Sequence, residues 1–187
     1  GGGWWDWLTP FTVTCGIALV AGYALLGTTW LVLKTEGTLR DSAYRFAIRS
    51  GLATLAFVGI VSLWTPFLSP EIAERWFTFP QLLFVLPVPT LTAILAAILG
   101  WSLIKRKDAI AFPTTIGLFA LCFAGLGIGI TPYIVPRAIT IQEAAAPDSS
   151  LLFMLVGAVI LLPLILAYTA YSYWVFRGKV DPDAGYH

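Results

Sequence analysis

The chain has 187 residues, of which 58% are hydrophobic and only 11% are charged, and its mean hydropathy is +0.84. A water-soluble domain of this length needs far more polar surface to cover its core, so the composition excludes a soluble protein and indicates an integral membrane protein. The net charge of +1 provides no positive field for nucleic acid, and no nucleic-acid partner is expected.

Five apolar stretches contain no charged side chain and predict membrane-spanning helices, at 11–33, 51–67, 77–104, 109–130 and 151–176. Each has at least the ~17 residues that a helix needs to cross the hydrocarbon core of a bilayer. The expected fold is an all-α integral membrane protein, with a bundle of five transmembrane helices over 1–176 and a cytoplasmic tail at 177–187.

The first span carries the small residues Ala18 and Gly22 four positions apart, which predicts a face where another helix can approach closely. The basic loop after this span is expected to form a short surface helix that runs into the second span. Within that helix Asp41 and Arg45 are four residues apart, a spacing that favours an ion pair between them.

The third span contains Pro87 and Pro89, which should bend the helix because proline cannot donate the main-chain hydrogen bond of a regular turn. In the fourth span, Gly125 and Gly129 form a second small-residue pair and predict another close-packing face. The segment 131–150 contains three prolines and is expected to be a loop.

Lysine and arginine are concentrated in the loops that follow the first, third and fifth spans. The residues there are Lys34, Arg40, Arg45, Arg49, Lys105, Arg106, Lys107, Arg177 and Lys179, whereas the opposite side holds only Arg75 and Arg137. Because basic residues mark cytoplasmic loops, this asymmetry predicts that the N-terminus faces outside and the C-terminus faces the cytoplasm.

Residues suited to redox or metal chemistry are scarce. The only histidine is His187 in the tail and the only methionine is Met154, while Cys15 and Cys122 lie in apolar spans and are interpreted as packing residues. A haem needs an axial His, Cys, Met or Tyr, and no pair of metal ligands occurs here at helical spacing. None of the five spans carries a charged residue for an ion path. We therefore predict no catalytic, cofactor-binding or metal-binding residue.

Four segments carry a more specific signal. They are Gly22-Tyr-Ala-Leu-Leu-Gly-Thr-Thr-Trp30 with Lys34-Thr-Glu-Gly37, Pro132-Tyr-Ile-Val-Pro136, Ala144-Ala-Ala-Pro147-Asp-Ser-Ser-Leu151, and the run from Leu162 to Val180. In this order they resemble subunit II of the cytochrome bd-type quinol oxidases, most closely the branch that includes the cyanide-insensitive oxidases. The motif residues to which no role is assigned are Gly22, Gly27, Trp30, Lys34, Glu36, Pro132, Pro136, Tyr168, Tyr171 and Trp174.

The resemblance implies a haem-free, non-catalytic subunit of a quinol:oxygen oxidoreductase in the bacterial inner membrane. Its partner would be subunit I, which binds haem b and haem d in this family, and a structural quinone or lipid is a candidate ligand. Family members have further N-terminal spans, so we expect this chain to be the C-terminal half. The sequence departs from the family pattern at Gln142-Glu143 and at Arg137.

Two other classes of protein are open from the residues alone. The first is half of a membrane transporter or channel, which the prolines of the third span favour because interrupted helices often frame substrate sites. The absence of membrane-embedded charge and of an inverted repeat argues against it. The second is a non-enzymatic membrane scaffold that binds lipid without an oxidase partner.

Overall fold

The computed structural model describes residues 3–5, 7–68, 74, 76, 78–79, 81–135 and 138–180. It divides into two compact units, 1–129 with 180–187 and 130–179, which are described separately. Five of the described helices are long and apolar enough to cross a membrane. This finding confirms the predicted all-α integral membrane fold.

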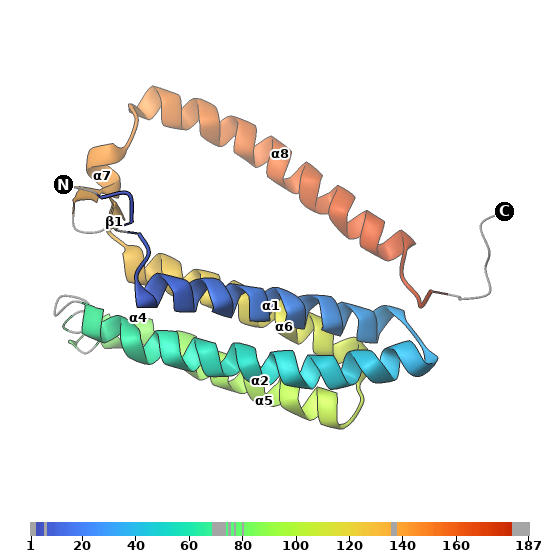
Figure 1. Ribbon diagram of the computed structural model, residues 1–187. Coiled ribbons are helices and arrows are strands. Elements are labelled where there is room, and N and C mark those ends of the chain that lie inside the picture. The colour runs from blue at the N-terminus through green and yellow to red at the C-terminus, as the bar shows by residue number, and fades with distance from the viewer. Residues whose placement is uncertain are drawn as a thin grey trace. The chain divides into compact units, whose positions relative to one another are not determined.

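The described part of the first unit contains four long helices and one short helix, arranged as in Figure 1. They are α1 (Pro10–Lys34), α2 (Gly37–Leu68), α4 (Gln81–Val85), α5 (Pro87–Ile104) and α6 (Asp108–Ile130). At the start of α1, the Thr9 hydroxyl accepts a hydrogen bond from the Thr12 amide at 3.2 Å, and Pro10 occupies the first helical position. This cap satisfies a main-chain donor that the helix itself cannot pair.

The second span is longer than its apolar stretch. A separate start near 51 is not seen, because α2 runs without interruption from Gly37 to Leu68 and includes the basic segment that was expected as a surface helix. Only Thr35 and Glu36 separate α1 from α2, so the two helices form a tight antiparallel hairpin.

The third span is broken where its prolines predict. Helix α4 ends at Val85 and α5 begins at Pro87, while Leu86 between them keeps helical dihedral angles. The Leu86 amide still bonds to the carbonyl of Leu82 at 2.9 Å. The interruption is therefore local, as expected when a proline removes one donor from an otherwise continuous helix.

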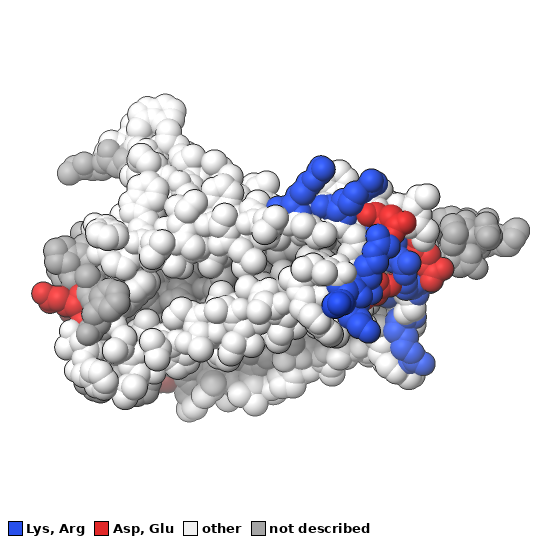
Figure 2. Space-filling view, turned by 90° about the horizontal axis from the view of Figure 1, so that it is seen from below, with Lys and Arg blue, Asp and Glu red and all other residues white. Residues whose placement is uncertain are grey.

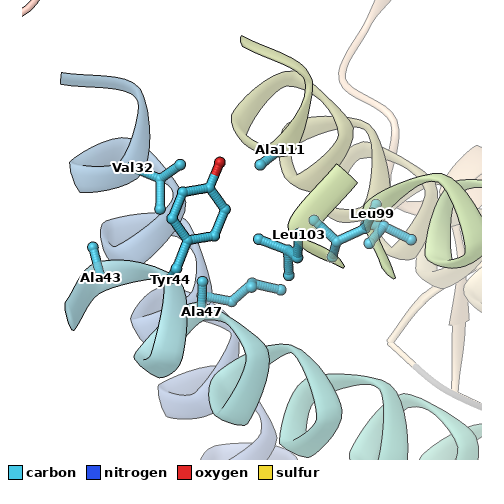
Figure 3. Packing of buried hydrophobic residues seen from close by; sticks show 9 residues of the cluster. Val32, Ala43, Tyr44, Ala47, Leu99, Leu103 and Ala111 are labelled. Atoms are coloured by element: carbon cyan, nitrogen blue, oxygen red, sulfur yellow. The ribbon is translucent and has the colours of Figure 1, made fainter. Parts of the chain in front are cut away.

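Side-chain contacts link the four long helices into a ring. Helix α1 packs along α2, α2 packs against α5, Leu95 of α5 contacts Gly117 of α6, and Phe119 of α6 contacts Gly22 of α1. A buried cluster fills one end of this ring, where Tyr44 lies among Val32, Leu103 and Ala111 (Figure 3). These contacts combine residues from all four helices into one core.

The second unit begins with a small ribbon instead of the predicted loop. Strands β1 (Tyr133–Val135) and β2 (Ile139–Thr140) pair antiparallel, and the helical turn α7 (Ile141–Ala144) follows them. The long helix α8 (Asp148–Val175) completes the unit, and none of its residues is buried. Helix α8 continues through Pro163 without a break.

Candidate functional site

The clearest concentration of polar side chains lies where α1 ends, α2 begins, and α5 turns into α6. Lysine and arginine side chains gather at this end of the four-helix unit, with a few acidic residues among them (Figure 2). Two of the basic loops identified from the sequence, those after the first and third spans, therefore meet in space, as expected for helices that alternate in direction. We call this region the basic end.

Asp108, the first residue of α6, binds two residues of α2 at the basic end. Its carboxylate accepts a hydrogen bond from the Tyr44 hydroxyl at 2.6 Å and forms an ion pair with the Arg40 guanidinium at 3.2 Å. Tyr44 is buried, and the side chains of Asp108 and Arg40 are 20% and 34% exposed. A half-buried carboxylate with two donors from α2 fixes α2 against the start of α6.

A second ion pair joins α2 to the turn between α5 and α6. Arg106 Nη1 lies 2.6 Å from Asp41 Oδ1, and the Arg106 guanidinium lies 5.2 Å from the centre of the Tyr44 ring. The predicted pair of Asp41 with Arg45 is wrong, because Arg45 donates to the hydroxyl of Ser42 at 3.1 Å. Asp41 instead pairs with a residue distant in the sequence.

The first family motif lies mainly at the interface of α1 with α6. Gly22 faces Phe119, whose Cζ would be 2.8 Å from a Cβ at this glycine. Two turns further along, the Trp30 ring packs on Phe112 with 4.9 Å between ring centres, and the Lys34 ammonium lies 5.1 Å from the centre of Trp30. The motif residues Gly22 and Trp30 thus pack against α6, and Lys34 contacts Trp30 within α1.

Two other residues of this motif lie elsewhere. No atom of the described residues lies within 4 Å of a Cβ placed on Gly27, apart from the backbone of its own helix and its chain neighbours. Glu36 is exposed in the link between α1 and α2, where its carbonyl accepts the Arg40 amide at 3.4 Å. The structure therefore does not bring all the motif residues together.

Of the small-residue pair in the fourth span, one glycine makes a close helix contact within the described chain. A Cβ on Gly125 would lie 3.1 Å from Val88 Cγ1 of α5, which is a close contact between helices. At Gly129, by contrast, no atom of the described residues lies within 4 Å of a Cβ. The predicted close-packing face is confirmed at Gly125 and stays a prediction at Gly129.

The remaining motif residues belong to the second unit. Pro132 precedes β1, and its carbonyl accepts the Ile141 amide at 2.8 Å. Pro136 lies outside the described residues. The aromatic residues of the last motif, Tyr168, Tyr171 and Trp174, are exposed near the end of α8. The ring centres of Tyr171 and Trp174 are 6.1 Å apart.

Glu143, a departure from the family pattern, has a local structural role. Thr140 caps α7, and the Glu143 carboxylate accepts hydrogen bonds from the Thr140 amide at 2.8 Å and from its hydroxyl at 2.9 Å. These hydrogen bonds lower the pKa of the Glu143 carboxyl, because they stabilise its charged form. The pair is a capping box that orders the start of this turn.

The residue types that ligate haem are dispersed. Cys15 lies on α1, Cys122 on α6 and Met154 on α8, and His187 lies outside the described residues. No group of three or more His, Cys, Asp or Glu side chains that could hold a metal ion occurs in the part of the chain that the structure describes. These residues do not fit a haem site.

Sequence reasoning missed the residues that organise the basic end. Tyr44 and Asp108 carry no motif, and Asp108 is preceded by three basic residues that make it resemble an ordinary loop acid. The aromatic partners Phe112 and Phe119 were equally inconspicuous within an apolar span. Their seven-residue spacing, matched by Tyr23 and Trp30 on α1, is the one signal that could have indicated two facing aromatic pairs.

Comparison with known proteins yields consistent matches. The cytochrome bd terminal oxidase subunit II family matches residues 1–176. The chain is 24% identical to cytochrome bd-I ubiquinol oxidase subunit 2 of Escherichia coli K12, over 97% of this chain and 56% of that protein. It is also 24% identical to cytochrome bd ubiquinol oxidase subunit 2 of Bacillus subtilis, over 94% of this chain and 52% of that protein.

The fold defines the class of protein: a multi-pass helical membrane protein with two ion pairs between helices at one end of a four-helix unit. Within that class, the chain belongs to the cytochrome bd terminal oxidase subunit II family. It spans about half the length of the curated relatives that it matches. Membership of this family favours the oxidase-subunit interpretation over the transporter and scaffold alternatives.

Proposed function

We propose that this chain is the C-terminal half of subunit II in a quinol:oxygen oxidoreductase of the bacterial inner membrane. The observation that carries the proposal is the family match over residues 1–176. In this proposal the chain contributes no catalytic residue and packs beside a subunit I that binds haem b and haem d. A structural quinone or lipid is a further candidate ligand.

The contacts at the basic end support a structural role for this half. Asp108 accepts from the Tyr44 hydroxyl and pairs with Arg40 Nη1, so its carboxylate is engaged in joining helices. The same holds for the motif residues Gly22 and Trp30, which receive aromatic side chains of α6. These residues stabilise a rigid four-helix unit, which suits a subunit that supports a partner carrying the redox groups.

Haem content tests this division of labour. The complete subunit II, expressed alone and purified in mild detergent, should show no haem in a reduced-minus-oxidised spectrum. Co-expression with subunit I should restore bands of both b-type and d-type haem, and His187→Ala should leave these bands and quinol oxidase activity unchanged, because an axial ligand must be held within the membrane part. Stoichiometric haem in subunit II alone, or loss of a haem band in His187→Ala, would refute the proposal.

We also propose that the basic end faces the cytoplasm together with the tail at 177–187. Lysine and arginine predominate at this end, and such residues are retained on the cytoplasmic side during insertion. In a background with Cys15→Ser and Cys122→Ser, a cysteine at Lys107 should react with a membrane-impermeant maleimide only after the cells are opened. A cysteine at Gln142 should react in intact cells, and the opposite pattern would reverse the topology.

A further inference from the structure

The turn between α5 and α6 has an unusual backbone. Arg106 has a φ of +54°, and it is the only residue other than glycine with a positive φ in the described chain. The Lys107 amide bonds to the Ser102 carbonyl at 2.8 Å, and the Arg106 amide bonds to the Leu103 carbonyl at 3.4 Å. This pair of bonds forms a helix C-terminal motif whose left-handed position is usually occupied by glycine.

An arginine at this position is strained, since its Cβ crowds the following carbonyl group in the left-handed conformation. The two glycines with positive φ, Gly37 and Gly178, avoid such crowding because they lack a Cβ. A glycine at 106 would let α5 end in the same way without strain. The presence of arginine therefore points to its side chain, which a glycine could not replace.

The Arg106 side chain contacts two residues on one face of α2. Its guanidinium pairs with Asp41 at 2.6 Å and lies 5.2 Å from the centre of the Tyr44 ring. Asp41 and Tyr44 are three residues apart, so they lie on adjacent turns of the helix. Tyr44 in turn donates to Asp108, two residues beyond Arg106, and the contacts close a loop between α2 and the α5–α6 turn.

We infer that Arg106 is a clasp that fastens the α5–α6 turn to the first turns of α2, and that its two side-chain contacts outweigh the strain of its backbone. The left-handed conformation directs the guanidinium over Tyr44, and this placement helps to keep the tyrosine hydroxyl on Asp108. The inference concerns the four-helix unit itself and does not depend on the proposed function.

Whether Arg106→Gly raises or lowers the thermal stability of the protein tests the clasp. The complete polypeptide would be purified in mild detergent in the complex in which it is expressed, and its thermal midpoint (Tm) measured at low and high salt. If the arginine were merely tolerated, Arg106→Gly would raise the Tm by removing strain. The clasp predicts instead a fall on the order of 2–4 °C, and a larger fall for Arg106→Ala, which keeps a Cβ but loses both contacts.

High salt should reduce the difference in Tm between the original protein and Arg106→Gly. The side chains of Arg106 and Asp41 are 58% and 51% exposed, so salt screens their attraction. Asp41→Asn should lower the Tm at low salt, and adding it to Arg106→Gly should cause little further loss. Arg45→Gln is the matched control, since this substitution removes the same charge from the same end, while among the described residues the Arg45 side chain bonds only to Ser42.

Three results would overturn the inference. The first is a Tm for Arg106→Gly at or above that of the original protein at low salt. The second is full additivity of Arg106→Gly with Asp41→Asn, which would show that the two side chains do not interact. The third is a fall for Arg45→Gln as large as that for Arg106→Gly, which would assign the effect to the net charge of the basic end.

Discussion

Asp108→Ala is expected to be among the most destabilising single substitutions in the four-helix unit. It removes the acceptor of the Tyr44 hydroxyl and the partner of the Arg40 guanidinium in one step. Because Tyr44 is buried and Arg40 is half-buried, both donors would be left without an equivalent partner. We expect a loss of about 2–3 kcal/mol, seen as a fall in Tm on the order of 5–10 °C in detergent.

Two variants separate the causes of this loss. Tyr44→Phe removes only the hydroxyl and should cost about 1 kcal/mol. Asp148→Ala removes the equivalent first-turn carboxylate of α8, which has no side-chain bond to the described residues, and so reports the helix-dipole contribution alone. A Tm of Asp108→Ala equal to that of Asp148→Ala would show that the bonds to α2 do not stabilise the unit.

Gly22→Leu is expected to separate α1 from α6. A Cβ at this position would lie 2.8 Å from Phe119 Cζ, and the ring also contacts Tyr23 of α1, with 5.9 Å between the two ring centres. The added side chain therefore displaces an aromatic group inside a packed interface. Overpacking of this kind costs roughly 1–3 kcal/mol, despite the better helix propensity of leucine, and the Tm of the detergent-solubilised complex should fall accordingly.

Gly27→Leu is the natural control, because it places the same side chain in the same helix and the same family motif. No atom of the described residues crowds Gly27, so this variant should keep the four-helix unit intact. Combining Gly22→Leu with Phe119→Ala should recover part of the lost stability by making room for the leucine. If the double variant is no more stable than Gly22→Leu, the Phe119 ring is not the source of the clash.

The positions of the helices could be predicted from the sequence because they depend on which residues follow one another along the chain. Uncharged stretches marked the five spans, and Pro87 marked the break in the third. The basic segment before Gly51 was predicted as a surface helix running into the second span, and α2 contains both, because the charged residues interrupt the apolar stretch without interrupting the helix. Charge indicates where a chain leaves the hydrocarbon, whereas a helix ends where its backbone pairing ends.

The partners of individual side chains were not accessible in the same way. Asp41 has a suitable arginine one turn away, and sequence spacing alone favours that neighbour. The folded chain instead places Arg106 within 2.6 Å of it. Similarly, Gly125 and Gly129 are equivalent by spacing, but among the described residues only Gly125 meets a side chain of α5. Such choices depend on the rotation of each helix about its axis, which one sequence does not specify.

The short link between α1 and α2 has a consequence for biogenesis. These helices approach each other more extensively than any other described pair, and only Thr35 and Glu36 join them. They can therefore enter the bilayer and associate as one hairpin while the ribosome is still making the remaining spans. Helix α6 arrives later and docks through contacts far apart in the chain, such as Phe119 on Gly22. Damage to this docking should yield an inserted but incompletely assembled chain, which is a substrate for membrane quality-control proteases.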